Sequence, residues 1–151
     1  MPEEEWDVWS CDYGADGYRL PTDAEWEYAC RAGTTSEFVF GGDESLLPRF
    51  GYYFGNSKDR TWPGGSLLPS LWGLFDMYGN VWEWCADWYG GYAAAAMSED
   101  PRGPADGSDR VYRGGCWFDV GECRSASRLS GTPSHGIGRV GFRVAASASG
   151  K

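Results

Sequence analysis

The stretch that most constrains the fold of this chain is the run from Arg110 to Ala146. It begins with the strand-like sequence Arg-Val-Tyr-Arg at 110–113, turns at Gly114-Gly115 and ends with a second strand-like run at 140–145. The segment between these ends is rich in glycine and serine, and it is expected to be irregular. A rigid frame that holds such a segment is a common way to build a binding surface.

The composition favours a loop-rich mixed fold. Nine tryptophans, nine tyrosines and 23 glycines suggest large aromatic side chains supporting irregular backbone, rather than a helical bundle. The 151 residues fit a single domain over 1–151. The formal charge of −9 argues against nucleic acid as a partner. No apolar run approaches the roughly 20 residues of a membrane-spanning helix, so no membrane insertion is expected. The acidic start of the chain is unlike a signal peptide, which leaves a cytoplasmic location as the default.

Local patterns predict several elements. Thr22 and Glu25 form a capping box and Gly33 is a stop signal, so we expect a helix from about Thr22 to Ala32. Alternating residues from Val81 onwards predict a strand, and residues 50–56 are expected to add a short one. Before the helix, residues 1–17 form either a first strand or a helical turn, anchored by the apolar side chains Trp6, Val8 and Trp9.

The five cysteines match no zinc signature and their number is odd. Their spacing favours small buried side chains in a reducing compartment. The alternative is one structural disulfide, with Cys30 and Cys123 as the candidate pair.

Four motifs occur in the order that is typical of one family: Tyr18-Arg-Leu-Pro-Thr-Asp-Ala-Glu-Trp-Glu-Tyr-Ala, Gly73-Leu-Phe-Asp-Met-Tyr-Gly-Asn-Val-Trp-Glu-Trp, Arg110-Val-Tyr-Arg-Gly-Gly and Gly141-Phe-Arg-Val. Through them the chain resembles the formylglycine-generating enzymes, or sulfatase-modifying factors, over roughly residues 17–146. The resemblance implies an α+β domain with the C-type lectin fold of that family, compact and loop-rich, with short twisted antiparallel strands. Only about 17 residues precede the first motif, so the N-terminal part is expected to be abbreviated.

The resemblance also allows the family's activity to be weighed. The enzymes are copper-dependent oxidoreductases that convert a protein cysteine to formylglycine, using two cysteines soon after the Gly-Gly turn. Thiolates suit Cu(I), but the first catalytic position falls at Asp119 here, and Cys116 and Cys123 sit at other offsets. We therefore expect no copper and no enzymatic activity.

A calcium site is a further implication of the resemblance. The family binds Ca²⁺ at positions that match Asp76, Gly79, Val81 and Glu83, and carboxylates with backbone carbonyls are suitable hard ligands. The alternative is that the two carboxylates only satisfy the backbone of the turn. The tryptophans of these motifs are expected to pack in the core rather than to stack on a carbohydrate: Trp82, Trp84, Trp88 and Trp117.

The same scaffold has a non-enzymatic use in the variable proteins of diversity-generating retroelements, whose C-terminal surface residues are randomised. The expected solvent-facing positions of this chain carry residues that such randomisation of an Asn codon can produce: Tyr112, Cys116, Phe118, Asp119, Val120, Leu129, Ser130, Gly131, His135, Gly136, Ile137, Gly138 and Arg139. We interpret the chain as a binding module for an unknown protein or other macromolecular ligand, with tyrosine and phenylalanine as anchors. A fixed, non-catalytic member of the family is the main alternative within this class.

Overall fold

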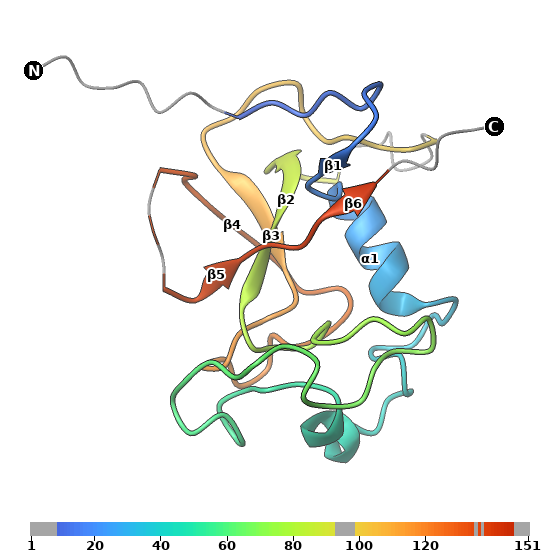
Figure 1. Ribbon diagram of the computed structural model, residues 1–151, viewed down its shortest axis with the longest axis vertical. Helices are drawn as coiled ribbons and strands as arrows, with labels where there is room; N and C mark the ends of the chain where they lie inside the picture. Colours follow the sequence, from blue (N-terminus) through green and yellow to red (C-terminus); the bar gives the residue numbers. More distant parts are fainter. Residues whose placement is uncertain (1–8, 93–98, 135, 137, 147–151) are drawn as a thin grey trace, which may run out of the picture.

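The computed structural model describes residues 9–92, 99–134, 136 and 138–146. The helical elements are α1 (Asp23–Arg31) and the 3-10 helix η1 (Glu44–Arg49). The strands are β1 (Tyr18–Arg19), β2 (Trp82–Trp88), β3 (Arg110–Arg113), β4 (Arg128–Gly131), β5 (Val140–Gly141) and β6 (Ala145–Ala146). Four strands form one sheet in the order β4-β3-β2-β5, and β1 pairs with β6 (Figure 1). No helix in this described part of the chain is long and apolar enough to cross a membrane.

Helix α1 begins where the capping box predicts. The Thr22 hydroxyl accepts a hydrogen bond from the Glu25 N–H at 3.1 Å, and the Glu25 carboxylate accepts one from the Thr22 N–H at 2.8 Å. The helix ends at Ala32, which adopts a left-handed conformation with φ of 45°, one residue before Gly33. The predicted helix is thus confirmed to within one residue at each end.

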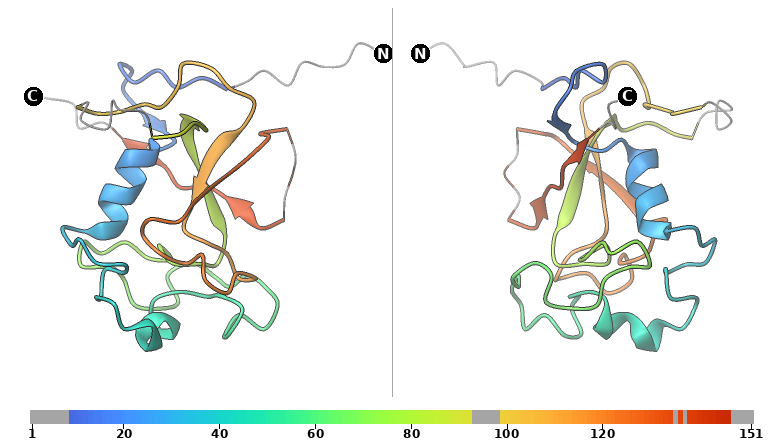
Figure 2. Two further views of the ribbon diagram at one scale, coloured as in Figure 1. Left: turned by 180° about the vertical axis from the view of Figure 1, so that it is seen from behind. Right: turned by 45° about the vertical axis from the view of Figure 1, so that its right-hand side comes forward.

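The central sheet separates two environments. Glu83 of β2 lies opposite Arg113 of β3, and both side chains contact α1. Because neighbouring residues of a strand point to opposite faces, Trp84 and its partner Tyr112 face away from α1. Figure 2 shows the sheet with α1 on one side, while the loops of residues 34–80 gather at the end where β2 begins. The helix side holds the core, and the other side is free to form a surface.

The core is built around Trp26 of α1. Buried apolar side chains from the helix, the loops and the sheet pack with it, among them Phe38, Leu47, Met77, Tyr78 and Val111. The indole N–H of Trp26 is also satisfied, since it donates to the Glu83 carboxylate at 2.7 Å. Aromatic side chains from the irregular segments thus supply much of the buried apolar contact, as the composition predicts.

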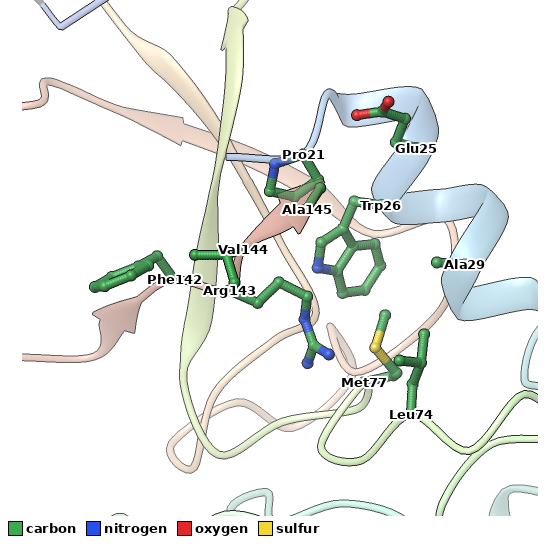
Figure 3. Close-up of a pocket in the computed structure, with 10 residues that line it drawn as sticks. All are labelled: Pro21, Glu25, Trp26, Ala29, Leu74, Met77, Phe142, Arg143, Val144 and Ala145. Carbon is green, nitrogen blue, oxygen red and sulfur yellow. The ribbon is translucent and has the colours of Figure 1, made fainter. Parts of the chain in front are cut away.

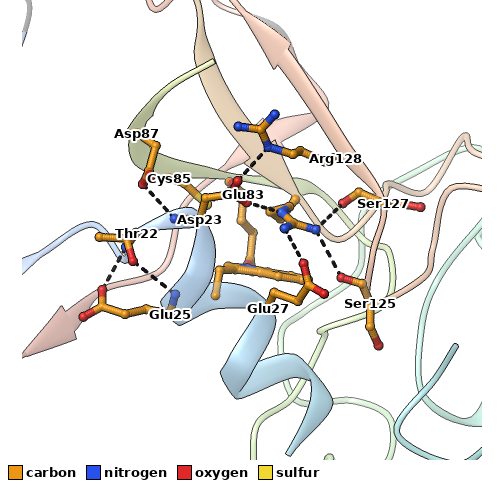
Figure 4. A network of polar contacts seen from close by, with 12 residues as sticks. Thr22, Asp23, Glu25, Glu27, Glu83, Cys85, Asp87, Ser125, Ser127 and Arg128 are labelled. Atoms are coloured by element: carbon orange, nitrogen blue, oxygen red, sulfur yellow. Dashed lines mark hydrogen bonds and ion pairs between the residues drawn. The ribbon is translucent and has the colours of Figure 1, made fainter. Parts of the chain in front are cut away.

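A buried ionic network joins α1 to the sheet (Figure 4). The Arg113 guanidinium binds the Asp23 carboxylate and, at 2.6 Å, the Glu27 carboxylate. It also donates to the carbonyls of Ser125 and Ser127 at 3.2 and 3.1 Å. These contacts fix the start of α1 and the chain beyond the Gly-Gly turn to one side chain of β3.

Three predicted elements differ from the structure. Residues 50–56 form no strand, because Asn56 accepts from the Tyr53 N–H at 2.9 Å and donates to the Gly51 carbonyl at 3.0 Å, which folds the segment into a loop. The 140–145 run divides into β5 and β6, which belong to different sheets, and β5 pairs parallel with β2. The segment before it is not wholly irregular, since β4 pairs with β3 along its full length.

The proposed disulfide is also wrong. All five cysteines are free thiols; Cys11 is half-buried and the others are buried. Burial raises the pKa of the Cys30 thiol to about 11, so it stays protonated as a small core residue.

Near the N-terminus Trp9 is an anchor, as expected. The Arg110 guanidinium lies between two indole rings, 4.2 Å from the centroid of Trp9 and 3.6 Å from that of Trp88, and it donates to the Trp9 carbonyl at 2.8 Å. Residues 9–17 contain no strand or helix. The two other expected anchors, Trp6 and Val8, lie outside the described residues, as does the tail after Ala146.

Candidate binding surface

One row of side chains crosses the sheet on the face away from α1. Trp84 lies opposite Tyr112 in the β2–β3 ladder, and Tyr112 lies opposite Leu129 in the β3–β4 ladder. The Tyr112 ring packs edge-on against Trp84 and Trp82, with centroids 5.2 Å apart in both pairs. Trp82, two residues before Trp84 on the same face of β2, is buried, whereas Leu129 at the far end of the row is 42% exposed. Directly opposite aromatic and apolar residues support each other in this way across a sheet.

The loop after the Gly-Gly turn continues this surface. Asp119 closes a short turn, since its carboxylate accepts from the Cys116 N–H at 2.7 Å and its own N–H donates to the Cys116 carbonyl. Gly115 is required here, because its φ is 78° and an added Cβ would lie 2.6 Å from the Cys123 sulfur. Phe118 and Val120 project from the turn and are 48% and 73% exposed. The frame is therefore tightly packed and the side chains that it presents are open to solvent.

A second aromatic group surrounds Phe118. Its ring lies edge-on to Phe54 at 6.0 Å and to Trp117 at 5.6 Å, and the Arg139 guanidinium lies 5.3 Å from its centroid. Burial raises the pKa of Tyr112, and the positive charge of Arg139 offsets part of this rise. The loop that carries Phe118 also follows directly on β3, the strand that carries Tyr112, so the row and the loop are neighbours along the chain.

Asn80 positions the loops that carry this surface. Its N–H donates to the Tyr52 carbonyl at 2.7 Å, and its carbonyl accepts from the Trp117 N–H at 3.0 Å. Its side chain makes two hydrogen bonds with the backbone of Trp62. One residue with a left-handed φ of 65° thus ties three separate loops together.

The predicted ligand-contact residues differ in how far the structure exposes them to solvent. Phe118, Val120 and Leu129 are exposed, as are the loop residues Gly136, Gly138 and Arg139, while Tyr112, Asp119, Ser130 and Gly131 are half-buried. Cys116 is only 1% exposed, so the expectation that it faces solvent is wrong. The strand period places Ser130 on the opposite face from Leu129, because its ladder partner is the core residue Val111. His135 and Ile137 lie outside the described residues.

Sequence reasoning missed two members of the surface. Phe54 comes from the 50–57 loop, and it reaches Phe118 because the Phe54 N–H donates to the Asp119 carbonyl at 3.1 Å. Trp84 is half-buried and was expected to be wholly part of the core. Strand alternation could have found Trp84, but no local signal places Phe54 here.

The cysteines after the Gly-Gly turn are poor metal ligands as they stand. Burial raises the pKa of Cys116 to about 11 and that of Cys123 still further, which disfavours the thiolate that binds metals. Cys123 points its sulfur at the Cys116 carbonyl at 3.9 Å. Among the described residues no three or more His, Cys, Asp or Glu side chains form a group that could hold a metal.

The four predicted calcium ligands line one cavity of about 420 Å³. One oxygen of Asp76 is buried with no hydrogen-bond partner in the described structure, which a bound cation would explain. Glu83 is already engaged, because Arg143 binds it at 2.5 and 2.7 Å and Trp26 donates to it. A carboxylate has about four acceptor sites, so these three contacts leave room for one more. If calcium binds here, Asp76 and the remaining acceptor site of Glu83 would hold it, together with carbonyls of the Gly79 turn.

A larger cavity of about 640 Å³ lies between α1 and residues 142–145 (Figure 3). Trp26 and Arg143 point into it, and its lining is mostly apolar. It is separate from the surface around Phe118, and none of the predicted ligand-contact residues lines it.

The fold and these motifs define a domain of the sulfatase-modifying factor type. The model of the sulfatase-modifying factor enzyme 1-like domain matches residues 4–148, and the chain belongs to this family. It is 40% identical to the formylglycine-generating enzyme of Streptomyces coelicolor over 148 residues, which cover 85% of this chain and 46% of that protein. It is 41% identical to the serine/threonine-protein kinase pkn1 of Chlamydia pneumoniae, over 88% of this chain and 22% of that one. The chain thus spans less than half the length of these relatives.

Solved structures agree on the fold. Variable protein 1 of Treponema denticola superimposes with a TM-score of 0.83 at 36% identity, covering 89% of this chain and 49% of that one. PvdO from Pseudomonas aeruginosa has a TM-score of 0.76 at 32% identity, covering 85% and 52%. The expected C-type lectin fold of the formylglycine-generating enzyme type is confirmed, and so is the resemblance to a variable protein.

Proposed function

We propose that this domain is a non-catalytic binding protein that displays a ligand-contact surface, drawn largely from residues 112–139, on a C-type lectin scaffold. The observation that supports this most is the contrast across the sheet. Arg113 and the Gly-Gly turn are fully buried, while Phe118, Val120 and Leu129 on the other face are exposed. Clustered apolar side chains on a rigid frame are typical of binding sites.

Within this class we propose a variable protein of a diversity-generating retroelement. The likeness to variable protein 1 of Treponema denticola supports this. The test is to sequence the locus from several isolates. Substitutions confined mainly to codons 112–139, beside a near-copy of that segment and a reverse transcriptase gene, are the expected result. One invariant sequence without a template copy would indicate a fixed family member instead.

The second candidate is a copper-dependent oxidoreductase, which the relationship to formylglycine-generating enzymes favours. Asp119 argues against it, because it stands at the expected copper position and its carboxylate is bonded within its own turn. The reduced protein would be loaded with Cu(I) and incubated with oxygen and a cysteine-containing sulfatase peptide. Aldehyde formation in the peptide would overturn the non-catalytic proposal.

A further inference from the structure

We propose that Phe54 and Trp84 are fixed contact residues of the same binding surface, and that its partner is a protein presenting an apolar side chain next to a carboxylate. This inference rests on the proposed binding function. Neither residue belongs to the 112–139 segment, so a surface that varies in that segment would keep both as a constant part. Their role follows from position, chemistry and exposure.

Phe54 lies at the edge of the exposed aromatic group, where its ring contacts Phe118. It is 53% exposed, and its ring extends the face formed by Phe118 and Trp117. Its backbone is held by the Asp119 carbonyl, and its loop is held by Asn80 through Tyr52. Because the loop is already ordered, a partner that covers Phe54 loses little entropy to gain the contact. Aromatic side chains on a rigid frame are the usual anchors of protein interfaces.

Trp84 provides the corresponding fixed part on the sheet. Trp84 lies opposite Tyr112, its ring packs edge-on against the Tyr112 ring, and its side chain is half-buried. Tyr112 and Leu129 complete the row, which crosses β2, β3 and β4. Apolar side chains of a partner can therefore pack across three strands. Neither Trp84, Tyr112 nor Phe54 lines the two cavities described above. A broad exposed apolar surface of this kind suits a protein partner.

Arg139 supplies the polar specificity. Its backbone carbonyl accepts from the Trp82 N–H at 2.9 Å, whereas its guanidinium lies over Phe118 and makes no ion pair or hydrogen bond with the described residues. A guanidinium stacked on an aromatic ring keeps its edge donors free and can bind a carboxylate through two hydrogen bonds. The chain as a whole is acidic, so the positive charge of Arg139 stands out locally on this surface. The matching partner group is an Asp or Glu beside an apolar side chain.

The test uses peptides selected on the native protein from a phage-displayed library of random 12-residue sequences. We expect the selected peptides to combine aromatic or aliphatic residues with Asp or Glu. Their Kd should rise at least tenfold on Phe118→Ser and on Phe54→Ser, and about threefold or more on Trp84→Phe, which preserves an aromatic ring and hence the fold. Tyr18→Ser, at a residue of β1 that is 81% exposed and outside the four-stranded sheet, is the matched control and should change nothing.

The outcomes separate the two proposals. Loss of binding on Phe118→Ser with unchanged binding on Phe54→Ser and Trp84→Phe would overturn this inference and leave the binding function intact. Peptides that depend on Tyr18 and not on Phe118, or no enrichment at all, would count against both. Selection repeated on Arg139→Glu should replace the acidic residues of the peptides with Lys or Arg. If the peptides selected on Arg139→Glu are still acidic, Arg139 does not bind the carboxylate of the partner. Thermal melting of each variant serves as the check of folding.

Discussion

The guanidinium of Arg113 on β3 is bound directly to the carboxylate of Asp23 in the first turn of α1. Arg113 is 1% exposed, and Arg128 binds the other oxygen of Asp23 at 2.6 Å. The helix and the frame of the binding surface are therefore held in register by charge-assisted hydrogen bonds. Their removal should damage the scaffold without touching the displayed side chains.

Arg113→Met is expected to destabilise the protein by about 3 kcal/mol, because it removes the buried guanidinium that bridges Asp23, Glu27 and the 125–127 backbone, and only Arg128 and Arg31 then remain on the two carboxylates. Urea unfolding followed by tryptophan fluorescence measures this. The control is Arg124→Ala, which removes the exposed pair with Glu37 (3.2 Å) and should cost less than about 1 kcal/mol. Equal costs for the two variants would contradict a structural role of the network.

Asp87 should make stability depend on pH. Burial raises its pKa from 3.8 to about 6 in the folded chain, and its carboxylate accepts from the Asp23 N–H at 2.7 Å. The folded state therefore holds this proton more tightly than the unfolded state, so the Asp87 contribution to stability falls as pH rises from about 4 to about 6. Asp87→Asn keeps an acceptor oxygen and should raise the free energy of unfolding at pH 7 by about 1–3 kcal/mol.

The pH profile distinguishes this effect from better packing. The gain from Asp87→Asn should shrink as the pH falls and approach zero below about pH 3, where the aspartic acid is mostly neutral in both the folded and the unfolded state. Asp106→Asn, at an exposed position, is the control and should leave the profile unchanged. A gain that is the same at about pH 3 and at pH 7 would disprove the titration of Asp87 as its cause.

Much of the fold follows from the sequence where the signals are local. The capping box at Thr22 and Glu25 determines α1, and the alternation after Val81 determines β2. Strand β4 was not predicted, because Arg-Leu-Ser-Gly has no apolar alternation and its pairing depends on β3. Arg128 reaches Asp23 from this strand, a contact between distant parts of the chain that no local pattern contains.

The candidate surface likewise contains some residues that could be predicted from the sequence and others that could not. The exposed loop side chains Phe118 and Val120 were predicted through the resemblance to variable proteins of the family. The burial of Cys116 could not be predicted, since it depends on the turn that Asp119 closes and on the packing of Cys123 beneath it. Phe54 was missed because hydrogen bonds to Asp119 and Asn80, rather than sequence proximity, bring its loop to the surface.

Calcium should stabilise the protein through Asp76. For a Kd near 10 μM, 1 mM Ca²⁺ is expected to raise the free energy of unfolding by about 2.7 kcal/mol, or the Tm by about 5–10 °C. Melting after chelation and again after addition of Ca²⁺ measures the shift. Asp76→Asn should reduce it strongly, whereas Asp106→Asn should not. An identical Tm with chelator and with calcium would mean that the carboxylates only support the turn.

The display surface should tolerate change at Val120 but not at Cys116. Val120→Tyr adds a ring at a 73% exposed position and should alter the free energy of unfolding by less than about 0.5 kcal/mol. Cys116→Tyr places the same ring at a 1% exposed position beside Cys123, where overpacking should cost about 2 kcal/mol or more. Urea unfolding of the two variants compares them directly. If Cys116→Tyr is as stable as Val120→Tyr, the loop can rearrange around position 116, and Cys116 returns to the set of displayed residues.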